Sequence, residues 1–388
     1  MEKIIEVLLF AYLVLFPFGQ LTRLPVRLED FPEVNFYLTD LVVGLLGMVG
    51  GIRVVKIARE KRYKLPVLAK PILVFLGITA GSLLVNIPLF QSREVIVAGL
   101  YWLRLLVYFG LYLGINLTNW SNWPNLLLVS GGAVAVFGLV QYFLWPDISA
   151  LTTLGWDPHY YRLAGTFLDP NFTGIILVLT IILLIANFKQ HLTCYLLLVI
   201  SYLSLALTYS RASWLALLGG VGSWFWLKKG KGGIKSIIFI IFIIIITAII
   251  LPRGRGGEGV KLERIASLQS RAGSWQQALI IAKDHPLFGV GFNTYRYAQK
   301  RYGFLEENWQ ISHAGAGADS SFLFVLATSG ILGVLGFLGV LGKILEISYK
   351  KSLLVFASLI AVITHSFFNN TLFYPWVMGW LAIILRTL

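Results

Sequence analysis

The sequence has very little charge for its length. Only 13% of its 388 residues are charged, whereas 57% are hydrophobic and the mean hydropathy is +0.78. Soluble domains carry about 25% charged residues, so this composition excludes an ordinary soluble enzyme and a disordered chain. The single cysteine, Cys194, has no partner within the chain and excludes a disulfide-stapled fold. The chain divides better into membrane-spanning segments of about 20 residues each.

Motifs that bind nucleotides or metals are also missing. The stretch 230–236 fails the spacing of a phosphate-binding loop. The sequence holds no Asp-x-Asp pair, no His-x-x-x-His motif and no cysteine cluster. We therefore expect neither an ATP-driven pump nor a metal-dependent nucleotide-sugar enzyme, and no metal or cofactor. The net charge of +14 is interpreted as basic cytoplasmic loops facing anionic lipid, and no nucleic-acid partner is expected.

Twelve apolar segments predict an all-α, polytopic integral membrane protein with about 12 transmembrane helices. The segments are residues 4–20, 37–54, 66–87, 95–117, 124–145, 171–188, 192–209, 211–227, 236–251, 320–342, 352–369 and 372–387. One set of alternate ends holds 16 Lys and Arg residues, and the short loops at the other ends hold five. The positive-inside rule therefore predicts that both termini are cytoplasmic.

The predicted domains follow from one connection that is far longer than a helix link requires. We expect membrane helices 1–9 over residues 1–251, an extracytoplasmic loop domain over 252–319, and membrane helices 10–12 over 320–388. Loops of more than about 12–15 residues are usually functional or disordered. Apolar residues recur at spacings of three and four from Leu262 to Ala282, which predicts an amphipathic helix ending before Pro286. A second short helix is expected over 293–302.

Arginines stand where the predicted helices meet the outer face. Ser210 and Arg211 form a tight turn between two apolar helices, and an arginine at this depth costs about 2.5–3.5 kcal/mol, so it should have an anionic partner. Arg264 and Arg271 are seven residues apart and share one helix face, where guanidinium forks suit a diphosphate. Arg162 is a further anion-binding candidate. The alternative is that these arginines are ordinary interfacial residues.

His313 lies in a stretch of small residues before the tenth membrane helix. An ordinary histidine pKa of about 6.5 suits proton transfer near neutral pH; the alternative is a surface histidine in a flexible loop. Asp319 or Ser320 is expected to cap the following helix. The helices that start near residues 171, 211 and 320 would all point their positive ends outward, which favours an anion there. A polyprenyl-diphosphate sugar, activated in advance and delivered by the membrane, fits this arrangement.

Four blocks between about residues 160 and 340 resemble the O-antigen ligase and O-antigen polymerase-like family of membrane glycosyltransferases. They are Arg162 with 165–167 and 170–171, then 208–214, then Arg271 with Trp275, Ala278 and 286–292, and finally His313 with 319–323 and 329–333. The blocks occur in the family's order, and the long outer loop lies in the corresponding place.

The resemblance implies a metal-independent glycosyltransferase of the cytoplasmic membrane that acts in polysaccharide or lipopolysaccharide biosynthesis of the cell envelope. It implies transfer of a glycan from undecaprenyl diphosphate to an acceptor hydroxyl at the outer face, with inversion. Carried onto this chain, Arg211 and Arg271 would bind the donor diphosphate, with Arg162 as a further candidate. His313 would deprotonate or position the acceptor hydroxyl. The supporting candidates are Arg264, Ser210 and Asp319.

Several alternatives stay open on the sequence alone. Within the family, the acceptor is a glycan, a lipid A core or a protein, and the sequence does not choose between ligase and polymerase. A different class is a lipid-linked glycan flippase or another secondary transporter. Such proteins commonly show internal repeats and polar sites at the membrane midplane, whereas this sequence shows no repeat and gathers its polar residues at the predicted outer ends. A non-catalytic scaffold leaves that gathering unexplained.

Overall fold

The computed structural model describes residues 2–24, 34–59, 65–187, 190–252, 260–262, 265–305, 309–310 and 317–388. Within these residues the chain is helical, and the only β-type pairings are two isolated bridges. Each of the twelve predicted apolar segments overlaps one α-helix. The bounds of these helices are α1 Glu2–Leu15, α2 Leu38–Arg59, α3 Ala69–Val85, α4 Ser92–Ile115, α5 Trp123–Leu144, α6 Pro170–Ala186, α7 Leu192–Leu207, α8 Arg211–Lys229, α9 Gly233–Ile250, α12 Ser321–Lys351, α13 Leu353–Ser366 and α14 Pro375–Ile384. Helix α12 continues nine residues beyond its predicted segment. Two further helices, α10 Ala266–Asp284 and α11 Tyr295–Arg301, lie in the predicted loop domain.

Five stretches of the described chain are long and apolar enough to cross a membrane. They are Glu2–Thr22, Ser92–Ile115, Trp123–Leu144, Arg211–Ile250 and Ser321–Lys351. The fourth of these takes in both α8 and α9, and shorter apolar helices, among them α6, α7 and α13, accompany the five. An all-helical chain with these lengths is consistent with a membrane protein. The number of crossings stays a prediction.

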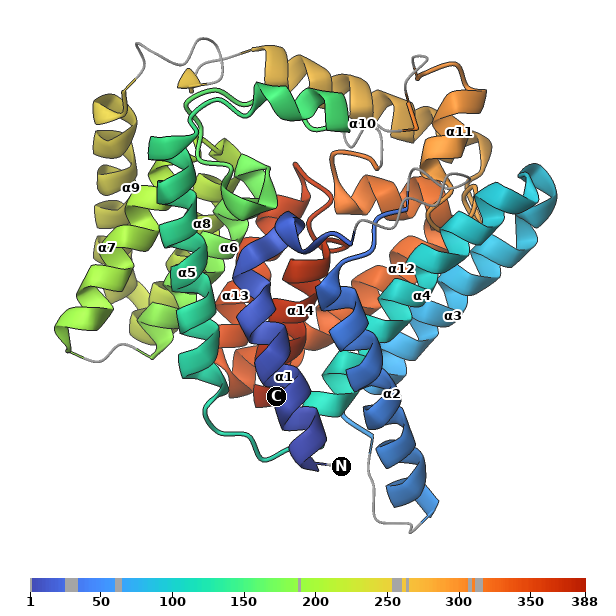
Figure 1. Cartoon of the computed structure of the whole chain (residues 1–388), viewed down its shortest axis with the longest axis horizontal. Helices are drawn as coiled ribbons and strands as arrows, with labels where there is room; N and C mark the ends of the chain where they lie inside the picture. Colours follow the sequence, from blue (N-terminus) through green and yellow to red (C-terminus); the bar gives the residue numbers. More distant parts are fainter. Residues whose placement is uncertain are drawn as a thin grey trace.

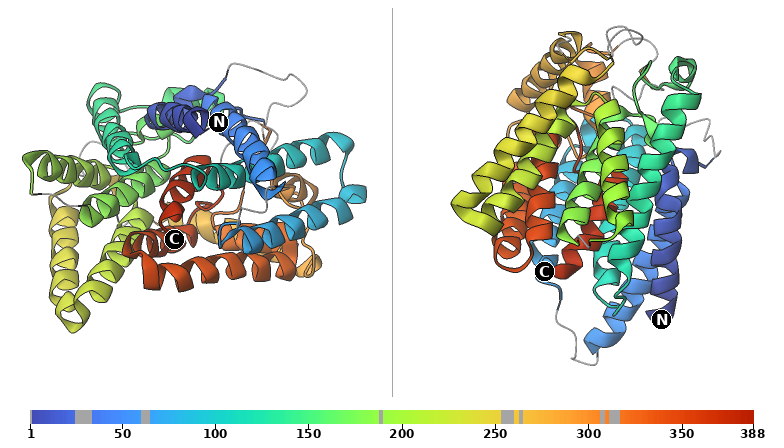
Figure 2. Two further views of the ribbon diagram at one scale, coloured as in Figure 1. Left: turned by 90° about the horizontal axis from the view of Figure 1, so that it is seen from below. Right: turned by 90° about the vertical axis from the view of Figure 1, so that its left-hand side faces the viewer.

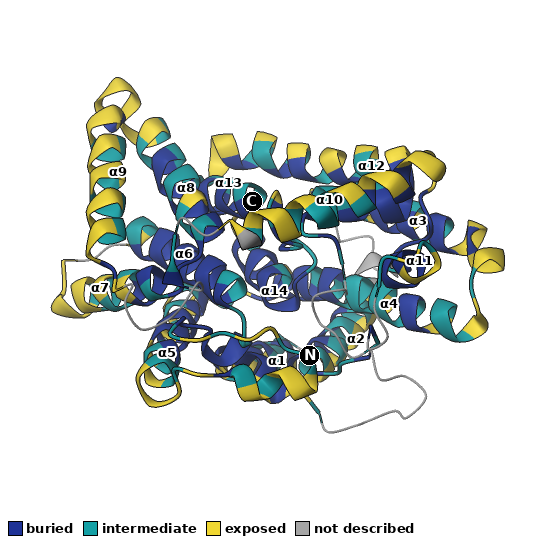
Figure 3. Cartoon of the chain, turned by 90° about the horizontal axis from the view of Figure 1, so that it is seen from above, coloured by how far each residue is buried: buried dark blue, intermediate teal, exposed yellow. Residues whose placement is uncertain are grey.

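The helices stand together as a bundle (Figures 1 and 2), and many large apolar side chains are exposed on it. Helix α6 is buried along nearly its whole length, whereas α9 lies at the edge of the bundle and is largely exposed (Figure 3). The exposed side chains of α9 include Ile238, Phe239, Phe242 and Ile249. Exposed apolar surface of this extent marks contact with a membrane or a partner, and in a membrane protein it faces lipid.

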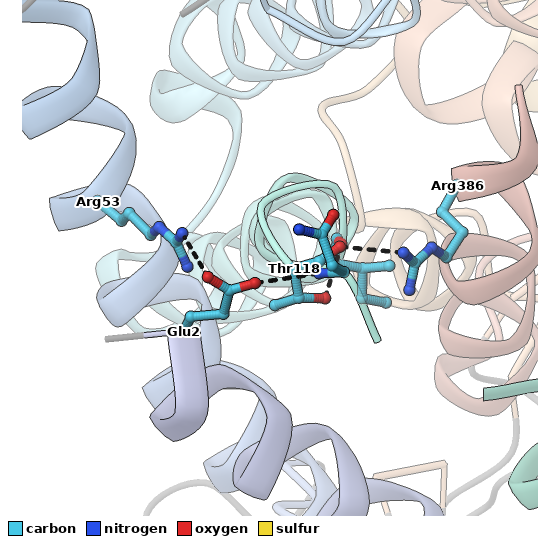
Figure 4. Close-up of polar contacts among 6 residues, drawn as sticks. Glu2, Arg53, Thr118 and Arg386 are labelled. Atoms are coloured by element: carbon cyan, nitrogen blue, oxygen red, sulfur yellow. Dashed lines mark hydrogen bonds and ion pairs between the residues drawn. The ribbon is translucent and has the colours of Figure 1, made fainter. Parts of the chain in front are cut away.

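Both termini lie at the end of the bundle opposite α10 (Figures 1 and 2). Polar contacts fasten this end (Figure 4): Glu2 accepts hydrogen bonds from Arg53 at 3.1 Å and from the backbone N–H of Asn119 at 3.2 Å. Arg386 donates to the carbonyl oxygen of Thr118 at 3.0 Å. The N-terminus, the C-terminus and the α4–α5 connection are therefore held together. Which end of the bundle faces the cytosol rests on the bias of basic residues.

Close packing of α8 against α13 sets the position of the start of α8. Ala212 and Ala216 are buried, as the spacing of small residues predicts. A Cβ atom added to Gly220 would come within 2.9 Å of the Ala357 carbonyl oxygen and of the Ala361 Cβ. Small side chains are therefore required along this face of α8.

A kink in α12 receives the segment that follows α10. Helix α12 bends at Gly330, which has a φ of +63°. Segments 286–291 and 327–331 pair through their backbones at the bend. Val290 donates to the carbonyl oxygen of Ala327 at 3.0 Å, Gly291 to that of Thr328 at 2.9 Å, and Ile331 to that of Pro286 at 2.8 Å.

Glycines on both sides of this pairing permit the close approach. Gly289 also has a φ of +63°. A Cβ atom on Gly330 would collide with the Leu287 carbonyl, and one on Gly289 would collide with the backbone of Thr328 and Ser329. Two of the sequence blocks that carry the family resemblance thus pack against each other and fix the end of α10 on α12.

Candidate active site

A strained turn presents Arg211 at the start of α8. Tyr209 is buried and has a φ of +51°, a left-handed conformation that is unfavourable for a residue with a side chain. Its hydroxyl donates to the carbonyl oxygen of Pro252 at 2.6 Å. Ser210 caps α8 by accepting a hydrogen bond from the backbone N–H of Ser213. These contacts make the reversal from α7 to α8 sharp, as the sequence predicts.

A buried chain of hydrogen bonds joins the starts of α6 and α8 to the end of α13. Ser210 donates to the amide oxygen of Asn171 at 2.8 Å, and Ser213 donates to Ser210 at 2.9 Å. The Ser213 hydroxyl also lies 3.2 Å from Nε2 of His365, whose Nδ1 is 2.7 Å from the hydroxyl of Thr371. His365 is fully buried. Ser213 lies 152 residues from His365, so the sequence offered no signal for the link between α8 and α13.

Arg162 supports the same turn from behind. Its side chain is buried, with 7% of its surface exposed, and its Nε donates to the carbonyl oxygen of Thr208 at 3.0 Å. Asp157 lies in the same loop. Burial raises the pKa of Asp157, the nearby Asp169 carboxylate raises it further, and the Arg162 guanidinium opposes both effects. Arg162 thereby comes close to the backbone that carries Arg211.

Asp169 begins α6 as the sequence predicts. Its carboxylate accepts hydrogen bonds from the backbone N–H groups of Asn171 at 2.6 Å and Phe172 at 3.2 Å, and Pro170 occupies the first helical position. Because Asn171 also contacts Ser210, the N-terminal ends of α6 and α8 meet. Their positive dipole ends favour an anion at this point.

Arg211 reaches from α8 to the start of α10. Its guanidinium donates to the carbonyl oxygen of Leu262 at 3.0 Å and to the hydroxyl of Ser267 at 2.6 Å. Both partners are neutral, and no described carboxylate forms an ion pair with Arg211. Arg271 lies one helical turn beyond Ser267 on the same face of α10. The structure therefore brings Arg211 and Arg271 together.

The face of α10 that points to the bundle differs from the predicted apolar face. The inward row consists of Ser267, Arg271, Ser274, Ala278 and Ile281, at successive spacings of four and three. Leu268 and Leu279 belong to the predicted apolar row, and about half of each side chain is exposed, whereas Ala282 in the same row is buried. The prediction of a helix is confirmed. Polar contacts with Arg211 on α8 and with Asp319 before α12 hold this face of α10 inward. The spacing of apolar residues does not predict such contacts.

Helix α10 clamps the backbone of Asp319 just before α12. The Asp319 N–H donates to the hydroxyl of Ser274 at 3.0 Å, and its carbonyl oxygen accepts from the indole N–H of Trp275 at 3.0 Å. Ser320 provides the cap of α12 by accepting from the backbone N–H of Leu323. Of the two predicted caps, the structure selects Ser320, and the Asp319 carboxyl group is not used in the cap.

Burial and mutual charge perturb Arg271 and Asp319. Burial lowers the pKa of Arg271; the Asp319 carboxylate raises it, and the Arg211 guanidinium lowers it. Burial raises the pKa of Asp319 to about 6, with Arg271 opposing and the carboxylates of Asp169 and Asp157 adding to the rise. Neither the Arg271 guanidinium nor the Asp319 carboxyl group makes a hydrogen bond or a close ion pair with any described residue.

Two predicted site residues, Arg264 and His313, lie outside the described residues. Their roles stay predictions. Sequence reasoning missed Asp157, Ser267 and Ser274 as neighbours of the site. The two serines stand seven residues apart with Arg271 between them, and this polar row at helical spacing was the available signal. In the described part of the chain, no three His, Cys, Asp or Glu side chains gather in a way that could hold a metal ion.

The fold is consistent with a helical membrane protein, and Arg211 and Arg271 lie near each other at one end of its bundle. Residues 196–338, from α7 into α12, match the family model described as O-antigen ligase. This match confirms the resemblance to the O-antigen ligase and polymerase-like family for that region, and it supports an O-antigen ligase-like function at the inner membrane in general. The matched region includes Arg211, Arg271 and Asp319 but not Arg162. No curated protein matches the chain.

Proposed function

We propose that the protein transfers a glycan from a polyprenyl-diphosphate donor, such as undecaprenyl diphosphate, to an acceptor hydroxyl at the outer face of the cytoplasmic membrane. The observation that carries this proposal is the meeting of Arg211 and Arg271 at the end of the bundle opposite the termini. In the described residues neither cation has a close anionic partner. A ligand with two or more negative charges would supply the missing partner.

A diphosphate leaving group fits the chemistry of this site. Guanidinium groups bind phosphate oxygens with two parallel hydrogen bonds. As the bond to the sugar breaks, negative charge grows on the diphosphate, and cations already in place stabilise that charge without reorganisation. The N-terminal ends of α6 and α8 add a positive potential. In this proposal the arginines provide the electrostatic role, so transfer is metal-independent.

The other predicted residues have defined places in the proposal. Arg162 contributes to donor binding by fixing the turn at Thr208, and Ser210 contributes by capping α8 beside Arg211. Arg264 is a further donor-binding candidate. His313 deprotonates or positions the acceptor hydroxyl. Attack in line with the departing diphosphate inverts the anomeric configuration.

The proposal is tested by reconstituting the purified protein in liposomes with a labelled polyprenyl-diphosphate oligosaccharide. Candidate acceptors are a polysaccharide, a lipid A core and a protein, offered separately. We expect a new glycosidic bond with one acceptor class, and loss of that product when Arg211 or Arg271 is changed to Ala. Arg301→Ala is the matched control, because Arg301 lies in the same loop domain and pairs with Glu94 at 3.2 Å in an exposed ion pair.

The same experiment can contradict the proposal. Movement of the labelled donor across the bilayer without any new glycosidic bond would indicate a flippase or another transporter. Equal product formation by the wild type, Arg211→Ala and Arg271→Ala would show that the two arginines do not form the donor site.

A further inference from the structure

Asp319 combines a fixed backbone with a carboxyl group that has no assigned task. Its N–H and its carbonyl oxygen are both held by α10, through Ser274 and Trp275, each at 3.0 Å. Ser320 takes the capping role at the start of α12. The Asp319 carboxyl group makes no hydrogen bond to any residue in the described ranges. The backbone of Asp319 is therefore fixed, and no hydrogen bond to a described residue engages its carboxyl group.

One face of α10 aligns this carboxyl group with both arginines. Ser267 contacts Arg211, Arg271 follows one turn later, and Ser274 holds Asp319 less than a turn beyond. A single rigid helix therefore sets the distances between the proposed donor site and Asp319. Asp319 therefore lies next to the proposed donor site, where its carboxyl group and the Arg271 guanidinium act on each other through their charges.

The charged and titratable groups around Asp319 come from four elements. Arg271 projects from α10, Asp169 precedes α6, Asp157 lies in the loop before it, and Tyr295 belongs to α11. Burial, opposed by the charge of Arg271 and assisted by the carboxylates of Asp169 and Asp157, raises the pKa of Asp319 to about 6. Burial and the Asp319 charge raise the pKa of Tyr295, so Tyr295 stays neutral. A carboxylate that titrates near neutrality is well suited to receive a proton.

We propose that Asp319 is the catalytic base of the glycan transfer: its carboxylate removes the proton of the acceptor hydroxyl as that oxygen attacks the anomeric carbon. This inference rests on the proposed function. The bond that forms joins the acceptor oxygen to the anomeric carbon, and the bond that breaks joins that carbon to the diphosphate oxygen. The polyprenyl diphosphate leaves with the electron pair beside Arg211 and Arg271. The proton ends on Asp319, and His313 has the positioning role.

The test compares Asp319→Asn, Asp319→Glu and His313→Gln in the reconstituted assay, with rates measured from pH 4.5 to 8.5. Asparagine keeps the shape of the side chain but cannot accept the proton. We expect Asp319→Asn to lower kcat by about 10²–10⁴-fold, the usual contribution of general base catalysis, with little change in the KM for the donor. Asp319→Glu should recover part of the rate.

The pH profile separates the two candidate bases. Wild-type activity should fall as pH drops through about 6, because the carboxylate becomes protonated. This acidic limb should persist in His313→Gln. Removing Arg271 removes the charge that restrains the Asp319 pKa, so residual activity of Arg271→Gln should show the limb at higher pH.

Each other outcome has a definite meaning. Wild-type kcat in Asp319→Asn, or loss of the acidic limb in His313→Gln, would overturn the assignment of the base. A raised donor KM with unchanged kcat in Asp319→Asn would also overturn it, because Asp319 would then only position Arg271. These results would leave the proposed function intact if the wild type still forms the product. Failure of the wild type to form any glycosidic bond would reject the proposed function itself.

Discussion

Arg104 and Arg271 are two arginines withdrawn from solvent, and the structure satisfies only one of them. Arg104, on α4, donates to the carboxylate of Asp40 at 2.7 Å and to the carbonyl oxygen of Asn35. Its guanidinium also lies over the rings of Tyr37 and Tyr101, at 5.6 and 4.9 Å from their centres. Arg271, on α10, has no such partner within the described residues, and only Asp319, Asp169 and Arg211 act on it through their charges.

The difference separates a buried arginine with a structural role from one that is available to bind a ligand. A cation whose hydrogen bonds are completed inside the chain is part of the architecture, because removing it leaves its partner unsatisfied. A cation left open beside a titratable carboxyl group is available to a ligand. Arg104 lies inside an apolar segment, where a buried and paired arginine is expected, but the sequence does not identify its partner, which lies 64 residues away.

The largest expected effect is on stability, from Arg104→Ala. The substitution leaves the Asp40 carboxylate buried without its counter-ion, and breaking a buried pair costs about 3–5 kcal/mol. The measurement is chemical or thermal unfolding of the purified protein in detergent. The double variant Arg104→Met with Asp40→Leu is the control, because it removes both charges and should recover most of the loss. An Arg104→Ala protein as stable as the wild type would show that the ion pair is not structural.

Arg271→Ala should produce the opposite pattern. Removing one preorganised donor to a developing anion typically costs about 10²–10³-fold in kcat, while the unfolding midpoint should stay close to that of the wild type. Glycan transfer and unfolding are measured on the same preparations as for Arg104→Ala. Arg271→Lys keeps the charge without the fork and should recover part of the rate. If Arg271→Ala unfolds as readily as Arg104→Ala, the contrast between the two arginines is lost.

Gly330→Ala tests whether the backbone pairing of segments 286–291 and 327–331 is needed to hold α10, and with it Arg271, in place. Alanine at a φ of +63° costs on the order of 1–3 kcal/mol, and its Cβ would meet the Leu287 carbonyl. We expect lower stability and slower transfer, because the end of α10 would be displaced. Gly339→Ala on the same helix is the matched control, since open space surrounds it and alanine favours a helix by about 1 kcal/mol. Equal effects of the two substitutions would contradict this role for the joint.

Helix positions were largely predictable, because long apolar runs have few other structures open to them. Local signals also served well: Asp169 with Pro170 marks the start of α6, and Ser210 marks the start of α8. Apolar spacing does not identify the polar residues of α10 that face the bundle. Ser267 and Ser274 bind partners on α8 and before α12, and those contacts decide which face turns inward.

The sequence singled out the arginines of the candidate site but did not indicate that its carboxylates lie close together. Arg211 and Arg271 stand out because charge is scarce in this chain, and the resemblance placed them in order along the sequence. Asp319 was weighed mainly as a helix cap. Its perturbation arises from burial together with Asp169 and Asp157, which come from a loop about 150 residues earlier, and no local pattern encodes such a meeting.

Asp157→Asn is the smallest expected effect and the sharpest test of how these charges act together. Asp157 contributes a negative charge that raises the pKa of Asp319, so its removal should lower that pKa and move the acidic limb of activity to lower pH. The shift should be smaller than the one in Arg271→Gln, because Arg271 acts on the pKa of Asp319 more strongly than Asp157 does. Asp169→Asn would act in the same direction but would also weaken the cap of α6, which makes Asp157 the better position. An acidic limb that stays in place in Asp157→Asn, while the maximal rate is unchanged, would show that the limb does not report on Asp319. A shift of the acidic limb to lower pH at an unchanged maximal rate would show that the pKa of Asp319 controls the rate of glycan transfer at the site that contains Arg271.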